Sequence, residues 1–239
     1  MPADAAKYLL SIADKGSQNF DVTGFVGVDT ISSPYQFDIE FRMSGNTKAL
    51  NITPPDASVL GEACRLDVER NGETIPYCGI VSEFRVCDSD DARYTVRLVP
   101  QLYSLTLNFT SRVFQNLTIP DIIKEVVNNA ELGEFVRYEL KTDDIKYPKR
   151  EFCVQYRETD FAFISRLMEE CGIWYYFEQV RQPWGAYKER AVVTDDFSKY
   201  PRLGRAVPFM NGSSLAEVTE VGNVVESINY ISANAALMP

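Results

Sequence analysis

The chain has 239 residues, 45% of them hydrophobic and 24% charged, which is the balance of a globular protein. Acidic residues outnumber basic ones by 34 to 24, and the formal net charge is −10. This charge argues against nucleic acid or an anionic membrane surface as the main partner, because both attract clustered lysine and arginine. The apolar runs are far too short to span a bilayer, so we expect no integral membrane segment. Residues 1–7 lack the basic start and apolar core of a signal peptide.

The first hundred residues predict β-structure. Residues 35–41 alternate apolar with polar side chains, which is the pattern of a half-buried strand, and residues 20–31 are a second strand region. Asn71-Gly72 predicts a hairpin turn. Longer strands are expected over residues 75–86 and 94–107. Several strands at hairpin spacing favour a barrel or a curled sheet.

The pattern changes near residue 110. Thr118–Asp121 is a helix start, with a proline tolerated in the first turn, and an apolar stripe follows over residues 119–127. Gly133 is expected to end this helix. Thr159 is expected to cap a second helix that runs to Cys171, with Gly172 as its left-handed end. Extended segments are expected at residues 134–158, 173–177, 191–194 and 224–231. The sequence therefore predicts an α+β segment with two helices.

Charged residues gather around the second helix: Arg157, Glu158, Asp160, Arg166, Glu169 and Glu170. A glycosidase needs two carboxylates held a defined distance apart across a sugar. Glu169 and Glu170 are adjacent on a helix and point in different directions, so they do not form such a pair. We favour a solvated or ion-paired face, in which an arginine–carboxylate pair fixes the strand to the helix.

Catalytic, cofactor-binding and metal-binding residues are not expected. The chain has no histidine, which removes Ser-His-Asp and Cys-His nucleophiles, histidine-containing zinc sites and the most common general base. It also lacks a phosphate-binding glycine loop and a Gly-x-Ser-x-Gly elbow. The acidic run Asp88–Asp91 resembles the start of a calcium loop, but the glycine at position six is missing and Val99 stands where the loop needs glutamate.

The five cysteines are Cys64, Cys78, Cys87, Cys153 and Cys171. Their number is odd and no Cys-x-x-Cys pair occurs, which fits reduced thiols in the cytosol that serve as small apolar residues.

Several segments resemble one family in the order in which that family carries them. Gln155–Leu167, with the sequence QYRETDFAFISRL, is the most specific, and Arg112–Ile123 is close to the family pattern. Gly27–Ile39, Tyr94–Leu107 and Cys78–Val81 also match, although the family more often has histidine before the glycine of the last segment. Over nearly its whole length the chain resembles the N-terminal hub region of VgrG, the tail-spike family of type VI secretion, which is related to the tail hubs of contractile phages.

The resemblance implies an α+β, β-rich fold with a β-barrel of the phage tail-hub type and an α+β portion carrying two helices. We expect residues 1–110 to be the first tail-hub barrel, complete or not, and residues 111–239 to be the α+β hub insertion. In the family a second barrel and a trimeric β-helix spike follow, and we expect this chain to stop before them.

The implied function is mechanical. The hub region would cap the Hcp hexamer tube, help to puncture target membranes and deliver effectors, without enzymatic activity or cofactors. Implied partners are two further copies in a full-length homotrimer, the Hcp tube, and baseplate and effector proteins; this chain alone could be monomeric. The protein would assemble in the cytoplasm and then be secreted, without a signal peptide, into the extracellular space or a target cell.

Three alternatives remain open. One is the baseplate hub of a contractile phage or tailocin. Another is a cell-wall hydrolase using Glu158, Asp160 or Glu169. The third is a carbohydrate-binding module, suggested by Trp174, Trp184 and thirteen tyrosines, although buried aromatic residues on strands account for these equally well.

Overall fold

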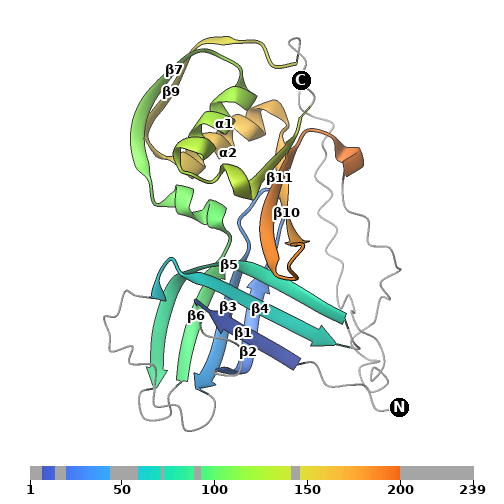
Figure 1. Cartoon of the computed structure of the whole chain (residues 1–239). Coiled ribbons are helices and arrows are strands. Elements are labelled where there is room, and N and C mark those ends of the chain that lie inside the picture. The colour runs from blue at the N-terminus through green and yellow to red at the C-terminus, as the bar shows by residue number, and fades with distance from the viewer. Residues whose placement is uncertain are drawn as a thin grey trace, which may run out of the picture. The chain divides into compact units, whose positions relative to one another are not determined.

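A computed structural model describes residues 7–13, 20–43, 59–70, 73–88, 93–140 and 146–199 (Figure 1). All of them belong to one compact unit, Ala6–Lys199. Within this part of the chain, no helix has the length and apolar character needed to cross a bilayer. The expected hairpin at Asn71-Gly72, the acidic loop after Asp88 and the strand at 224–231 lie outside the described residues.

Six antiparallel strands form one sheet in the order β1-β4-β5-β6-β3-β2. They are β1 (Lys7–Ile12), β2 (Phe20–Val28), β3 (Gln36–Met43), β4 (Ala63–Arg70), β5 (Glu73–Asp88) and β6 (Arg93–Val99). The order places β1 and β2 at the two edges of the sheet. Even so, the ring centroids of Tyr8 on β1 and Phe25 on β2 are only 5.3 Å apart. The sheet therefore curls until its edges approach each other, as Figure 1 shows, and the expected barrel-type sheet is confirmed.

Alternation explains why these strands enclose a core. Phe37, Ile39 and Phe41 of β3 are at most 4% exposed, whereas the polar residues between them face outward. The same period brings Tyr94, Val96 and Leu98 of β6 to the inside of the curl. The other members of this cluster are Leu10, Ile12, Phe20, Tyr35, Val59, Cys64, Leu66 and Val81.

The second half of the described chain is α+β. It contains η3 (Gln101–Thr106), β7 (Phe109–Leu117), α1 (Ile119–Asn129), η4 (Gly133–Phe135), β8 (Val136–Glu139), β9 (Arg150–Thr159), α2 (Asp160–Cys171), β10 (Trp174–Arg181), β11 (Tyr187–Thr194) and η5 (Phe197–Lys199). Strands β7 and β9 pair as an antiparallel ribbon, and β10-β11-β8 form a small mixed sheet in which β11 and β8 are parallel. Helices α1 and α2 lie side by side inside the bend of the ribbon (Figure 1).

Both helices begin where the sequence predicts, and α2 also ends there, whereas α1 ends at Asn129 and Gly133, its predicted end, begins η4. The hydroxyl of Thr118 accepts from the amide of Asp121 at 3.2 Å, and that of Thr159 accepts from the amide of Ala162 at 3.1 Å. Gly172 ends α2 with a φ of 64°, in the left-handed region. Local signals therefore predict the starts of both helices and the end of α2.

Three predicted strands need correction. The strand expected over 94–107 ends at Val99, because Pro100 has no amide hydrogen to continue the ladder, and the 3-10 helix η3 follows. Residues 134–158 are not continuously extended: η4 and β8 fill the start, and β9 begins only at Arg150. The short strand expected at 191–194 begins four residues earlier, at Tyr187, because β10 pairs with it along its whole length.

Most buried hydrophobic residues belong to two clusters. One comprises residues of β1–β6 and their connections between Leu10 and Leu98, and the other lies between Leu102 and Val193. Phe177 of β10 packs against both clusters. The division of the chain into domains at residue 110 stays a prediction.

Candidate functional site

The corner between β9 and α2 carries the charged residues that the sequence singles out. Asp160, in the first turn of α2, is 1% exposed. Its carboxylate accepts from Nε2 of Gln155 at 2.8 Å, from the guanidinium of Arg112 and from the side-chain amide of Asn108. These donors come from β9, β7 and the residue before β7, so Asp160 ties three segments together.

A second ion pair joins the same strand and helix. The guanidinium of Arg166 on α2 donates to both carboxylate oxygens of Glu158 on β9, at 2.8 to 3.2 Å. It also donates to the carbonyl of Val154 at 2.8 Å. These hydrogen bonds from Arg166 hold the pKa of Glu158 below its usual value. The expected arginine–carboxylate pair that fixes strand to helix is thus confirmed.

The remaining charged residues of the cluster do not converge on one point. Glu170 pairs with Arg150, which lowers the pKa of the Glu170 carboxyl, and Glu169 is exposed. Arg157 lies over the ring of Tyr156 instead of meeting a carboxylate of the cluster. Carboxyl groups with lowered pKa are ionised at neutral pH and are poor proton donors, so this geometry is unlike a glycosidase pair.

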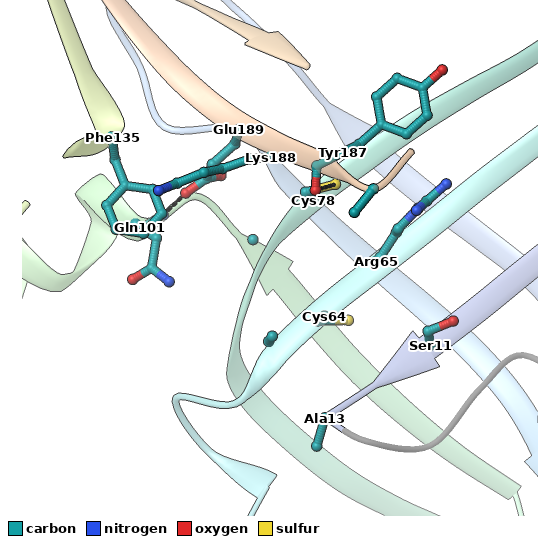
Figure 2. Close-up of a pocket in the computed structure, with 13 residues that line it drawn as sticks. Ser11, Ala13, Cys64, Arg65, Cys78, Gln101, Phe135, Tyr187, Lys188 and Glu189 are labelled. Carbon is teal, nitrogen blue, oxygen red and sulfur yellow. Dashed lines mark hydrogen bonds between the residues drawn. The ribbon is translucent and has the colours of Figure 1, made fainter. Parts of the chain in front are cut away.

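A cavity of about 450 Å³ lies where the curled sheet meets β11. Figure 2 shows side chains from β1, β4 and β5 on one side and Tyr187, Lys188 and Glu189 of β11 on the other. The sequence did not point to this site. Glu189 lies just before the strand predicted at 191–194 and belongs to no motif, and only the tertiary fold buries it.

Glu189 is the unusual group of this cavity, because it is only 3% exposed. The backbone amide of Gln101 and the hydroxyl of Tyr35 donate to its carboxylate. Burial raises the pKa of Glu189 to about 7, against the opposing effect of these donors. Burial, the adjacent Glu189 charge and the hydrogen bond to it raise the pKa of Tyr35.

The tyrosine hydroxyl has one proton but two acceptors, the Glu189 carboxylate and the carbonyl of Cys78. A protonated Glu189 would resolve this conflict by donating to Tyr35, which would then donate to Cys78. The raised pKa of Glu189 and the number of acceptors around the Tyr35 hydroxyl both favour the protonated form of Glu189. In either protonation state, Glu189 links the curled sheet to β11 through Tyr35.

Other polar groups of the cavity have partners within the chain. Lys188 donates to Glu134 at 2.6 Å and lies 4.1 Å from the centre of the Phe135 ring. Arg65 pairs with Asp67 at 2.8 Å and stacks over Tyr187. These pairings leave neither cation aimed at a ligand.

The two cysteines of the cavity are not nucleophiles. Burial raises the pKa of Cys78 to about 11 and that of Cys64 further above its usual value. Among the described side chains, no three His, Cys, Asp or Glu residues come together in a way that could hold a metal ion.

The two tryptophans do not form a shared sugar-binding platform. Trp174 is buried and stacks on Tyr176 and Phe197, whereas Trp184 is 76% exposed in the turn between β10 and β11. Trp174 therefore serves the core, which is the alternative that the sequence left open.

Comparison with known proteins gives a consistent result. The sequence pattern of the phage tail baseplate hub (GPD) family matches residues 28–233. The type VI secretion system spike protein VgrG5 of Pseudomonas aeruginosa is 32% identical over 217 residues, covering 90% of this chain and 25% of that protein. The chain thus spans about a quarter of the length of the curated relatives it matches.

Solved structures agree with the sequence comparison. The E. coli c3393 protein, described as a type VI secretion component similar to the T4 bacteriophage tail proteins gp27 and gp5, superposes with a TM-score of 0.67 at 29% identity, covering 84% of this chain and 51% of that one. A chain of the Francisella PdpA–VgrG complex shares the fold, with a TM-score of 0.56 at 10% identity over 80% of this chain and 28% of that one.

Proposed function

Because the chain belongs to the phage tail baseplate hub family, we propose that it is the structural hub region of a type VI secretion spike. The observation that carries this proposal is the 32% identity to a VgrG spike protein over 90% of the chain. The superposition on the c3393 protein supports it independently, because that protein is itself described as a type VI component.

In the proposed mechanism the chain transmits force and catalyses no chemical reaction. Three copies of the complete polypeptide cap the hexameric Hcp tube as a closed ring, and contraction drives tube and spike through a target membrane. The buried contacts of Asp160 and Glu189 suit this role, because each ties together segments that are far apart in the sequence. Rigidity under load is what these contacts supply.

The proposed life cycle follows from this role. The chain assembles with baseplate and effector proteins in the cytoplasm and leaves the cell with the spike, into the medium or a target cell. The Francisella complex is a precedent for a VgrG bound to another protein, named there as PdpA.

We also propose that the chain has no catalytic activity. One relative is named actin cross-linking toxin VgrG1, from Vibrio cholerae, but this chain spans only 21% of that protein at 28% identity. Of the carboxylates considered for cell-wall hydrolysis, Asp160 and Glu158 are held by arginines and Glu169 is exposed on its helix. The alternative that retains support is the hub of a contractile phage or tailocin, because the matching family is described as a phage baseplate hub.

Electron microscopy tests the proposed position in the machine. Gold-labelled chain would be mixed with tubes of the Hcp protein encoded with it. We expect gold at one end of each tube, since a hub caps the tube and does not coat it. Gold along the tube walls, or tubes without gold, would overturn the proposal.

A further inference from the structure

The β7–β9 ribbon has one buried side and one exposed side. On the buried side Phe114 stacks on Phe163 of α2 at 5.4 Å, and Cys153 and Gln155 are buried. Figure 1 shows this ribbon curving around the two helices. The exposed side carries a set of residues that we call the outer face: Val113, Gln115, Phe152, Val154 and Tyr156.

The outer face is apolar although it is exposed. Its four apolar residues are between 47% and 66% exposed, whereas a solvated strand face normally carries polar side chains. Taking about 200 Å² for a fully exposed aromatic side chain, these residues expose on the order of 400 Å² of apolar surface. This is about half of the ~800 Å² that each partner contributes to a standard interface, so the outer face suits one segment of a partner.

A β-bulge at one end of the ribbon sets the position of Arg157. The register shifts between Thr110 and Arg112, so two residues of β9 lie against one residue of β7. Arg157 has a φ of 49°, in the left-handed region, and its amide donates to the hydroxyl of Ser111 at 3.1 Å. Glycine would adopt this backbone without strain, so the bulge alone does not explain an arginine here.

The fold does not use the charge of Arg157. The neighbouring Glu158 and Asp160 both pair with arginines, whereas Arg157 makes no ion pair with any residue that the structure describes. Its guanidinium lies 5.4 Å from the centre of the Tyr156 ring, so the bulge brings this charge to the outer face. Arginine and tyrosine are among the residues most enriched at the energetic centres of interfaces.

The ribbon also differs in charge from the rest of the chain. Strand β7 carries one arginine, and β9 carries two arginines and two glutamates, whereas the whole chain has a formal net charge of −10. The other two arginines of the ribbon pair with Asp160 and Glu170. Glu151 alternates with Phe152 and so points to the other side of the strand. The charge that fits beside the outer face is therefore a carboxylate, which can meet Arg157.

We propose that the outer face and Arg157 form a docking site for a partner protein that lays one apolar, acidic segment across the ribbon. Apolar side chains of the segment cover Val113, Phe152 and Val154. An aspartate or glutamate of the segment accepts both hydrogen bonds of the Arg157 guanidinium edge, a geometry that arginine favours. The inference rests on the ribbon alone, so it holds for a secretion spike and for a phage tail hub.

Selection from random peptides of about ten residues, about 33 Å long when extended, tests the docking site. Peptides that bind the whole chain should combine apolar residues with aspartate or glutamate. The tightest of them should bind Arg157→Gly and Val154→Lys at least about tenfold more weakly in calorimetric titrations. Two matched controls should bind like the original chain. They are Arg181→Gly, at an exposed arginine of β10, and Ile75→Lys, at a position of β5 that is 47% exposed, as Val154 is.

Thermal unfolding of Arg157→Gly separates docking from folding. Glycine adopts a φ of 49° without strain, so the variant should unfold at the temperature of the original chain or above it, although it binds peptide more weakly. A lower unfolding temperature would show that the arginine supports the fold, and it would overturn the role of Arg157 in docking.

Three outcomes of the selection would also overturn the inference. They are a selection that enriches no peptide, enriched peptides that bind both variants as tightly as the original chain, and enriched peptides without an acidic residue. Vesicles that contain phosphatidylglycerol provide the remaining comparison. If the chain binds these vesicles in place of peptides, and both variants lose that binding, the outer face contacts a membrane surface and the docking of a protein segment is wrong.

Discussion

Asp160 shows how a charged residue of the specific sequence segment can be structural. It is buried at the start of α2, and its carboxylate accepts from side chains of β7, β9 and the residue that precedes β7. Its own amide donates to the carbonyl of Asn108 at 2.9 Å. A carboxylate that is 1% exposed and held by three donors of its own chain is not accessible to a substrate.

Replacing Asp160 should therefore destabilise the fold. Asp160→Ala leaves the Arg112 guanidinium and two side-chain amides without their acceptor, and we expect a loss of about 3 kcal/mol in the free energy of unfolding. Urea denaturation measures this loss. Glu169→Ala, at an exposed position of the same helix, is the control and should stay within about 0.5 kcal/mol. Equal losses in the two variants would refute the role of Asp160.

Glu189 should make stability depend on pH in the direction opposite to most carboxylates. Its pKa rises from 4.5 in the unfolded chain to about 7 in the folded protein, so the folded state binds more protons between these values. Its contribution is therefore complete below pH 4.5 and is lost as the pH rises through about 7. The full difference corresponds to about 3 kcal/mol.

Glu189→Gln isolates this contribution, because glutamine cannot ionise. We expect the stability difference between the variant and the original to shift in favour of the variant as the pH rises from about 4.5 to about 8. Thermal unfolding across that range measures it. The comparison is needed because Glu158 and Glu170, whose pKa values are lowered, contribute stability that is lost as the pH falls. A pH-independent difference would contradict the account of Glu189.

At the scale of elements, the helix α2 depends on its two ends. Thr159 caps the first turn, and Gly172 closes the last turn with a φ of 64°. The amides of Gly172 and Ile173 bond back to the carbonyls of Glu169 and Met168, which completes the end of the helix. The aromatic strand β10 can then begin at Trp174.

Gly172→Ala should cost about 1 kcal/mol, because a side chain with Cβ strains the left-handed backbone although there is open space around it. Chemical denaturation provides the measurement. Gly24→Ala is a matched control: its surroundings are equally open and its φ is not in the left-handed region. If both variants lose the same stability, the left-handed end is not the cause.

The sequence predicted those elements whose signals are local. Caps such as Thr159 and the left-handed Gly172 act within one turn, so they could be read directly. Alternation in β9 predicted two faces but not which one is buried, since a period of two is satisfied either way. The structure buries Cys153 and Gln155 and exposes Phe152, Val154 and Tyr156. The burial of Glu189 could not be predicted, because it depends on contacts with residues 88 and 154 positions away.

At the scale of the whole described unit, a few contacts join the two hydrophobic clusters. The hydroxyl of Tyr35, at the curled sheet, donates a hydrogen bond to Glu189. The ring centroids of Tyr35 and Phe177 of β10 are 4.9 Å apart. The amide of Ser32 donates to the carbonyl of Tyr175 at 2.9 Å. These contacts join the curled sheet to the α+β part.

Tyr35→Phe tests this connection by removing one hydroxyl. The change leaves the Cys78 carbonyl and Glu189 without their shared partner, and we expect a loss of about 2 kcal/mol in the free energy of unfolding. Tyr156→Phe removes a hydroxyl from a ring that is 66% exposed and should be nearly neutral. Denaturation of both variants in parallel measures the two losses. If Tyr35→Phe leaves the free energy of unfolding unchanged, the Tyr35 hydroxyl does not link the two clusters.

The central claim is that the chain acts as a structural hub and not as an enzyme, and secretion of the tube protein tests it most directly. In cells that lack the coding region for this chain, we predict that Hcp disappears from the medium. The original sequence and Glu158→Gln should restore it equally, since the Glu158 carboxylate is held by Arg166 and glutamine keeps its shape. Continued secretion without the region would contradict the account. So would a folded Glu158→Gln protein that fails to restore secretion.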